Sequence, residues 1–474
     1  MRRLLTILNV VLLITLVILS LYVFDIIDFK FLEKNEEPLI EVPIADTPDK
    51  VERRKSYEEY MQKGDTFNAS GLYTLAIDSY TNASEEEPDR IEPLVLIGEL
   101  QILQRNYETA KNLASKILEK SPKNTDAKVI LGRANIGLEQ FDEAKKIFDS
   151  ITIDYPDVLY YQGLMALYFG EYEKARGFLN GAVDPEKTPD SEIKNNAQRL
   201  INAMNEFDAY QAGLHEHLQV LLARAMVQNN EPHMAKDLLW KVLKEDRSYR
   251  DAWIVLGYSY LKLESFEDAI DALEEAKRQD PDKPETLFYL GLAYAGNDQL
   301  QDSIDALELA LKLNYEPKIH IEQKLAELYF QIEDYETSSD KYEEVISMNA
   351  SDLEYFIRPI WVYIDKLKQP NKAVALAEKA SLNHPDSSMA YNLLGWAQIS
   401  NNDFINGKKN LQKALTYDHS FDAPYLNLGT MYEKQGEIGR AKEMYIKAYE
   451  LGNGNAVGNL AAEKYNELLA NVLN

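Results

Sequence analysis

The sequence contains no cysteine, and this absence removes several kinds of chemistry. Without thiols there is no disulfide, no thiolate metal site, no thiol nucleophile and no lipid-modified N-terminal cysteine. Basic residues are also outnumbered, because 51 Lys and Arg stand against 78 Asp and Glu, which gives a formal net charge of −27. Most exposed faces therefore repel phosphate, and we expect no nucleic-acid partner.

Motifs of common active sites are missing as well. The sequence has no glycine-rich phosphate loop, no HExxH and no GxSxG. Among its six histidines, His215 and His217 are two residues apart, which on a helix points them in nearly opposite directions and makes a poor chelate. We therefore expect no enzyme activity, no catalytic residue, no cofactor and no metal site.

What the sequence does contain is a repeat, which is clearest in the stretch from Asp251 to Pro281. Trp253, Leu256, Gly257 and Tyr260 are matched 34 positions later by Leu287, Leu290, Gly291 and Tyr294. These positions, which are 4, 7, 8 and 11 of the repeating unit, share one face of a helix. Ala269, Leu273 and Ala276 share a face of a second helix, which Pro281 ends. The period predicts helical hairpins that stack into an array and leave no segment for a catalytic domain.

The pattern WxxLGxxY, followed by Ala, Leu, Ala and Pro, resembles the tetratricopeptide repeat, and the resemblance extends over about four fifths of the chain. It implies an all-α superhelical solenoid of about eleven helix-turn-helix repeats. The expected units begin near Tyr57, Ile91, Thr125, Pro156, Glu216, Arg250, Pro284, Ile319, Glu354, Ser388 and Asp422. In this family the concave groove holds an extended or helical peptide, so the resemblance implies a protein or peptide partner.

The N-terminus predicts a membrane anchor. Leu4 to Phe24 carries no charge over 21 positions, which is about 31 Å of helix and enough to cross a bilayer. We therefore expect one transmembrane helix, a signal anchor over residues 1–24, ahead of the solenoid. A cleaved signal peptide is the alternative, but bulky residues stand where a peptidase needs small ones. Arg2 and Arg3 favour a single-pass protein with a cytoplasmic N-terminus and an extracytoplasmic, periplasm-like repeat region. A cytoplasmic repeat region is the alternative.

The rest of the chain divides by composition. Residues 25–56 contain Pro38, Pro43 and Pro48 and predict an extended linker. An N-terminal repeat block is expected over 57–187 and a C-terminal block over 216–455. Between them, residues 188–215 have helical periodicity without the repeat signature, which predicts an extra helix at a junction. Residues 456–474 predict a capping helix. Pro359 and Trp361 depart from the pattern and predict a kink or a wider helix pair.

Candidate binding residues follow from the helix geometry. If positions 4, 7, 8 and 11 face the second helix, positions 2, 6, 9 and 13, flanked by 5 and 12, face the groove. In the C-terminal block large apolar residues occupy these positions; they are Tyr258, Phe288, Tyr289, Leu292, Tyr355, Val362, Met389 and Trp396. Packing against neighbouring helices is the alternative explanation for them. In the N-terminal block the groove is expected to be acidic, with Glu58, Asp65, Glu92, Glu99 and Asp126.

Two hypotheses for function follow. The first is a membrane-anchored scaffold that binds a protein or peptide in its groove and holds it near the membrane, in envelope assembly, secretion or chaperone-like work. The second is a structural spacer or a self-associating component of a membrane machine, which allows a homo-oligomer.

Overall fold

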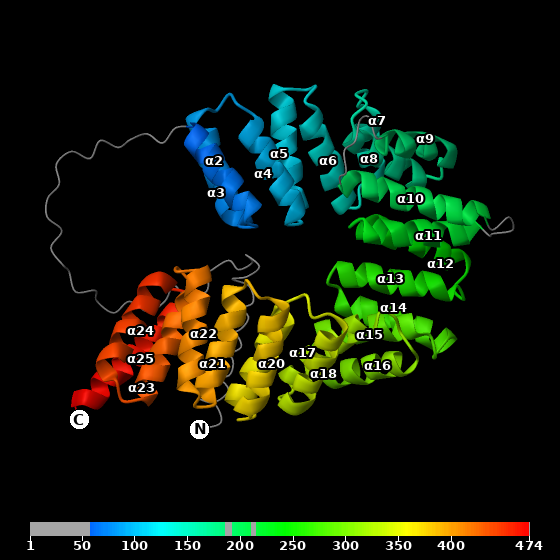
Figure 1. The fold of residues 1–474 in the computed structure, drawn as a ribbon. Coiled ribbons are helices and arrows are strands. Elements are labelled where there is room, and N and C mark those ends of the chain that lie inside the picture. The colour runs from blue at the N-terminus through cyan, green and yellow to red at the C-terminus, as the bar shows by residue number, and fades with distance from the viewer. Residues whose placement is uncertain (1–56, 185–191, 210–214, 474) are drawn as a thin grey trace. The chain divides into compact units, whose positions relative to one another are not determined.

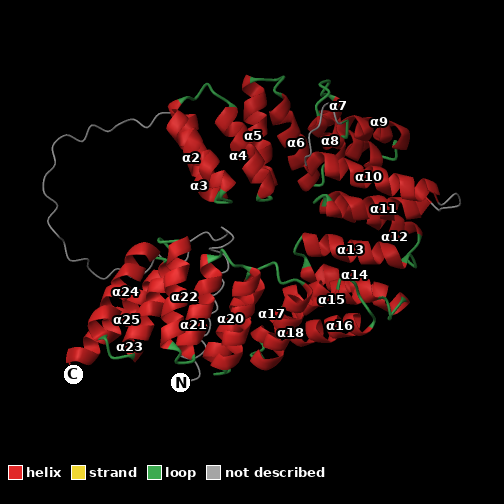
Figure 2. Ribbon diagram, in the orientation of Figure 1, coloured by secondary structure: helices red, strands yellow, loops and turns green. Residues whose placement is uncertain are grey.

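The computed structural model of the chain describes residues 57–184, 192–209 and 215–473. All regular structure in these ranges is helical (Figure 2). Eleven helical hairpins and two single helices, α10 and α25, account for the twenty-four α-helices of the described residues. The all-α solenoid predicted from the repeat is therefore confirmed.

The described residues fall into two compact units that divide after Pro281. Successive helices of each unit lie side by side along the chain (Figure 1). Up to Pro281 the helices are α2 (Tyr57–Ala69), α3 (Tyr73–Glu86), α4 (Glu92–Leu103), α5 (Tyr107–Lys120), α6 (Thr125–Gly137), α7 (Phe141–Asp149), α8 (Pro156–Tyr168), α9 (Tyr172–Ala182), α10 (Glu192–Ala209), α11 (His215–Gln228), α12 (Pro232–Glu245), α13 (Arg250–Lys262) and α14 (Phe266–Gln279). From Asp282 on they are α15 (Pro284–Gly296), α16 (Leu300–Lys312), α17 (Lys318–Gln331), α18 (Tyr335–Met348), α19 (Glu354–Trp361), the π-helix η1 (Val362–Lys366), α20 (Pro370–Asn383), α21 (Ser388–Ser400), α22 (Phe404–Tyr417), α23 (Asp422–Lys434), α24 (Ile438–Gly452) and α25 (Ala456–Leu473).

In most of the hairpins a glycine in the first helix allows the two helices to pack closely. A β-carbon on Gly257 would meet Leu273, sixteen residues further on in the second helix. The same spacing recurs in other hairpins, where a bulky side chain of the second helix covers the glycine. The pairs are Gly64 with Tyr80, Gly132 with Phe148, Gly163 with Leu179, Gly291 with Leu307, Gly395 with Leu411 and Gly429 with Tyr445. The glycine of the repeat pattern therefore specifies that the two helix backbones pack closely.

The turn inside each of the eleven described hairpins passes through one residue with positive φ. It is a glycine at 71, 170 and 436, and another residue, such as Glu264 with φ of 59°, in the remaining turns. The amide of the following residue then bonds back to the end of the first helix, as Ser265 N–H does to the Tyr260 carbonyl at 3.0 Å. This geometry satisfies a helix-end carbonyl that would otherwise lack a partner.

In the unit that ends at Pro281, α10 packs between α9 and α11 and also against α8. The expected junction at 188–215 contains this helix, yet the compact unit continues through α14. Contacts far apart in sequence explain why. Arg105 donates a hydrogen bond to the Lys262 carbonyl at 2.6 Å, and Glu139 pairs with Lys236 at 2.5 Å. These contacts join the hairpins on both sides of α10 into one body.

In the unit that begins at Asp282, the irregular hairpin lies where Pro359 and Trp361 predicted it. The helix α19 holds Pro359 in its interior and ends at Trp361, where the chain widens into the π-helix η1. Proline removes a backbone donor from the helical ladder, and π-turns absorb such local disruption. At the other end of this unit, α25 packs on α24.

The expected membrane anchor requires a correction. Leu4 to Phe24 lies outside the described residues, and within residues 57–184, 192–209 and 215–473 no helix combines the length and apolar character needed to cross a membrane. The fold is therefore an all-α repeat array, and the predicted preceding transmembrane helix is not supported. The predicted single-pass membrane localisation loses its support for the same reason.

Candidate functional site

Within each unit the first helices of neighbouring hairpins contact one another, as α4 and α6 do before Pro281 and α21 and α23 do after it. We call the side of a unit that these helices form its first-helix side. In the unit that ends at Pro281, a cavity of about 350 Å³ opens there. Its walls come from α4, α6, α8 and α10, from the start of α5, and from the turn between α11 and α12. Its volume falls in the range of small ligand pockets. The lining combines apolar, aromatic and charged residues, so it can hold a group with both apolar and charged parts.

Arg133 occupies one wall of the cavity and is already paired. Its guanidinium forms an ion pair with Glu99 of α4 and lies 5.8 Å from the ring centroid of Tyr161 of α8. Burial opposes the charge on Arg133, but Tyr161, Glu99 and Glu231 outweigh burial and hold the pKa of its guanidinium above the usual value. Tyr161 is itself fixed, since its ring stacks on Phe148 at 5.1 Å. On this wall the charge of Arg133 is therefore balanced by Glu99, and the Arg133 and Tyr161 side chains are held in place by their contacts.

The turn between α11 and α12 supplies a further part of the cavity lining. Asn230 takes the left-handed conformation, with φ of 61°, which asparagine tolerates well. Glu231 is the N-cap of α12 and Pro232 is its first residue, but the Glu231 side chain does not cap the helix. Among the described residues the Glu231 carboxylate has no hydrogen bond and no ion pair, and it lines the cavity instead.

The environment of Glu231 perturbs its ionisation. The side chain keeps some contact with water through the cavity, but protein atoms surround it densely. Burial raises the pKa of the Glu231 carboxyl to about 7, and Arg133 opposes this rise without cancelling it. Asp157 on α8 is exposed, but nearby protein atoms partly desolvate its carboxyl and raise its pKa, again against the field of Arg133. Asp157 also lines the cavity without a hydrogen bond or ion pair in the described part of the chain.

A buried polar network holds this turn in place. Asn229, which is 6% exposed, donates to the Asn196 carbonyl of α10 at 2.9 Å and to the Tyr160 hydroxyl at 3.3 Å. Arg199 of α10 donates to the side-chain oxygens of both Asn196 and Asn229, at 2.6 and 2.9 Å. The network ties α8, α10 and the α11–α12 turn together, so the position of Glu231 depends on the extra helix.

A second set of contacts includes His233, which also lines the cavity. Glu139, in the turn after α6, accepts bonds from Lys236 at 2.5 Å and interacts with His233 at 3.1 Å. Burial raises the pKa of Glu139, but these two partners outweigh it and lower the pKa overall. Burial lowers the pKa of His233, which also meets the Tyr107 ring edge-on at 5.7 Å. We call the Glu139, His233 and Lys236 contacts the clasp.

The residues expected to form the binding groove are mostly half-buried. Val362 is 0% exposed and Phe288 is 8% exposed, and Phe288 stacks on Tyr315 at 4.4 Å. These two side chains pack inside the apolar clusters and expose little surface to a partner. The other expected residues pack on the cores but keep part of their surface exposed; they are Tyr258, Tyr289, Leu292, Tyr355, Met389 and Trp396. Tyr258 lies before Pro281, and the others lie in the unit that follows.

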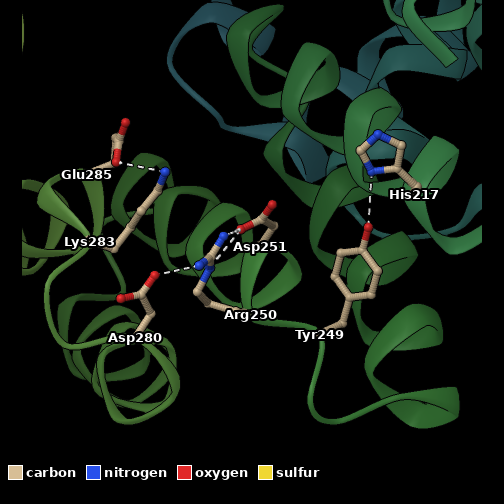
Figure 3. A network of polar contacts seen from close by, with 7 residues as sticks. All are labelled: His217, Tyr249, Arg250, Asp251, Asp280, Lys283 and Glu285. Atoms are coloured by element: carbon tan, nitrogen blue, oxygen red, sulfur yellow. Dashed lines mark hydrogen bonds and ion pairs between the residues drawn. The ribbon is translucent and has the colours of Figure 1, made fainter. Parts of the chain in front are cut away.

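The two neighbouring histidines diverge, as their spacing predicted. His217 meets the Tyr249 hydroxyl at 3.0 Å (Figure 3), whereas His215 meets the Tyr172 hydroxyl at 3.2 Å. Arg250, the first residue of α13, bonds Asp280 at 2.5 Å and Asp251 at 2.8 Å, which links the start of this hairpin to its end (Figure 3). Within the described ranges no group of His, Asp and Glu is placed to hold a metal ion.

One residue of the cavity lining, Glu99, was named among the acidic residues expected in the groove, and three others were predicted only by implication. Arg133, Asp157 and Tyr161 occupy positions 9, 2 and 6 of their units, which are the positions that face the groove. Applying the same positional rule to every residue type in the N-terminal block would have found them. Asn229 and Glu231 lie in a turn that folds back toward helices about a hundred residues earlier. No local periodicity reports such a contact.

Stacked helical hairpins define this chain as a helical-repeat protein. Family models of the tetratricopeptide repeat match residues 101–168, residues 220–284 and 254–316, and residues 423–452. The chain therefore contains tetratricopeptide repeats, as its sequence pattern indicated, and this is a scaffold fold that is usually non-enzymatic.

One curated relative and several solved structures are similar to this chain. Tetratricopeptide repeat protein 21A of Mus musculus is 33% identical over 105 residues, which is 21% of this chain and 8% of that protein's length. The crystal structure of the APC/C hetero-tetramer Cut9-Hcn1 aligns at a TM-score of 0.34 with 10% identity, over 88% of this chain and 96% of that one. Yeast Tom70 gives 0.31 with 14% identity over 88% and 96%, and MamA gives 0.28 with 21% identity over 42% and 95%. These TM-scores are below 0.5, so we draw no conclusion from the structural likenesses.

Proposed function

We propose that this chain is a protein-binding scaffold that takes a segment of a partner on its first-helix side. The observation that carries the proposal is a set of large, half-buried side chains on first helices of the unit that begins at Asp282. Tyr289, Leu292, Tyr355, Met389 and Trp396 come from the first helices α15, α19 and α21. Aromatic and large apolar residues that are partly exposed and rigidly supported are typical anchors of protein interfaces.

The support beneath these residues favours binding over a purely structural role. Trp396 contacts two apolar clusters, one around Phe356 and Tyr363 and one around Phe330 and Trp361. A side chain held in this way loses little conformational entropy when a partner covers its free face. Tyr258, on the first helix α13 of the preceding unit, is a further proposed anchor, with the Lys262 ammonium 5.9 Å from its ring centroid.

Site-specific photo-crosslinking tests this proposal. A photoreactive residue in place of Met389, on the first-helix side, is compared with one in place of Ile405, which lies on the second helix α22 and is 85% exposed. We expect Met389 to crosslink a protein that Ile405 does not reach. The captured protein is then purified, and its affinity for the full chain is measured by calorimetry.

Two results would contradict the proposal. If the purified protein shows no affinity for the full chain, capture was incidental. If Met389 crosslinks only to further copies of the chain, and light scattering shows an oligomer, the array is instead a self-associating structural component.

A further inference from the structure

We propose that the cavity between α4, α6, α8, α10 and the α11–α12 turn binds a cationic side chain, an arginine or a lysine, from a partner segment. This assignment rests on the proposed protein-binding function and adds the chemistry of one contact to it. It concerns the unit that ends at Pro281, whereas Trp396 and the residues proposed with it lie in the unit that follows.

The apolar part of the lining fits the stem of such a side chain. Ile102, Val129 and Ile136 are at most 9% exposed and form apolar wall from α4 and α6. Ile193 of α10 adds a further apolar contact. Arginine and lysine bury their methylene stems along surfaces of this kind while the charged head reaches polar groups.

The polar part of the lining fits the head. Glu231 and Asp157 come from different elements and, in the described part of the chain, have neither a hydrogen bond nor an ion pair. Glu231 is half-buried and Asp157 is exposed. A half-buried carboxylate without a partner is costly, and a cation with several N–H donors supplies the bonds that Glu231 lacks and can reach Asp157 as well. Glu192, exposed at the start of α10, adds a third carboxylate at the rim.

The basic residues of the lining do not favour an anion instead. Arg133 already pairs with Glu99, and Arg105 donates to the Lys262 carbonyl. The lining contains more acidic than basic groups, since it has four carboxylates and two guanidinium groups. The lowered pKa of His233 keeps its imidazole neutral. The carboxylates are those of Glu99, Asp157, Glu192 and Glu231. The net charge of −27 also raises the local concentration of basic segments around the chain.

Binding of a cation is coupled to loss of a proton. Burial raises the pKa of Glu231, so part of its population is protonated near neutral pH, and an incoming cation returns the pKa toward its usual range. The proton leaves to solvent. The charged and titratable groups around Glu231 on the packed elements are Glu99, Arg105, Tyr107, Arg133, Asp157, Tyr160, Tyr161, Glu192 and His233. Affinity for the cation therefore rises between about pH 6 and about pH 8.

Calorimetry with the full chain tests the assignment. The probe is a short acetylated and amidated peptide of glycine and serine with one central arginine, compared with the same peptide carrying citrulline, which keeps the shape without the charge. At about pH 8 we expect the arginine peptide to bind about tenfold more tightly, as one charged hydrogen-bonding contact supplies.

Variants connect this preference to the cavity. Glu231→Gln is expected to remove most of the preference for arginine, and Asp157→Asn is expected to reduce it. Glu119→Gln removes the same charge from an exposed position of α5 outside the lining and is expected to leave it intact. Circular dichroism confirms that each variant is folded.

The outcomes separate the two proposals. Equal affinities for the two peptides, no binding of either, or an unchanged preference in both Glu231→Gln and Asp157→Asn would overturn the cationic site, whatever the crosslinking at Met389 shows. If methylguanidinium binds as tightly as the arginine peptide, the cavity takes a free small cation and the assignment to a partner segment fails. A preserved arginine preference without any crosslinked partner would instead overturn the proposed scaffold function.

Discussion

Gly257 of α13 faces Leu273 of α14 so closely that a β-carbon on the glycine would lie 2.7 Å from Cδ2 of the leucine. Leu273 is 0% exposed and has no space to withdraw. We therefore expect Gly257→Ala to lower the free energy of unfolding by about 1 to 3 kcal/mol, because overpacking forces the helices apart. Urea unfolding followed by circular dichroism measures this change.

Gly177 is the matched control for this substitution. It lies inside α9 and is exposed, and a β-carbon there would meet no atom within 4 Å. Gly177→Ala is expected to raise stability by about 0.5 to 1 kcal/mol, since alanine is the better helix former. If both variants shifted stability in the same direction, close packing at Gly257 would not be the cause.

The pairing of Gly257 with Leu273 also shows how far sequence reasoning reaches in this chain. Both residues belong to one repeat, so the 34-residue pattern predicted the hairpin from local periodicity alone. The same holds for Pro359 and Trp361, whose departure from the pattern marked the place where α19 ends and η1 follows.

The repeat pattern does not predict that the walls of the cavity come together, because they are distant in sequence. Glu231 reaches its position only because the hairpins on both sides of α10 close on each other through contacts such as Glu139 with Lys236. Their approach depends on small angles between successive hairpins that add up along the array. Neither composition nor periodicity encodes these angles in a form that can be extracted from one sequence.

The turn residue Glu264 is expected to be a point of backbone strain. It is exposed and has φ of 59°, a conformation that costs a residue with a β-carbon about 1 kcal/mol relative to glycine. Glu264→Gly should therefore stabilise the chain by about that amount in urea unfolding. Glu267→Gly, three residues later in the first turn of α14, should destabilise it. Loss of stability in both variants would show that the turn is unstrained.

Breaking the clasp tests how much the contact between the α6–α7 turn and α12 contributes to stability. Lys236 and Glu139 are 21% and 41% exposed, so we expect Lys236→Gln to lower the free energy of unfolding by about 0.2 to 1 kcal/mol. Because Glu139 has a lowered pKa in the folded chain, its contribution is present above the unfolded value, about 4.3, and disappears as pH falls. The difference between wild type and variant should therefore shrink below about pH 4.

The control for the clasp is Lys146→Gln, which breaks a pair with Glu143 within α7 whose side chains are 74% and 56% exposed. It should change stability little at any pH. Hydrogen exchange of the α12 amides adds a local measure, because opening of the clasp exposes the start of that helix. Equal effects of the two lysine variants would mean that the clasp adds nothing beyond an ordinary surface pair.

Glu231→Gln should stabilise the chain at alkaline pH. Burial raises the pKa of the Glu231 carboxyl to about 7, against about 4.3 in the unfolded chain. Between these values the folded state holds a proton that the unfolded state has released, so stability falls as pH rises, and the loss is complete above about pH 7. Glutamine carries no charge and avoids the loss. We expect the free energy of unfolding of the variant in urea to exceed that of wild type by about 1 to 3 kcal/mol at about pH 8 and to equal it at about pH 4.

The control is Glu119→Gln, whose effect on stability should not depend on pH in this way. If the gain for Glu231→Gln persists unchanged at acidic pH, packing of the amide is responsible and the buried charge is not.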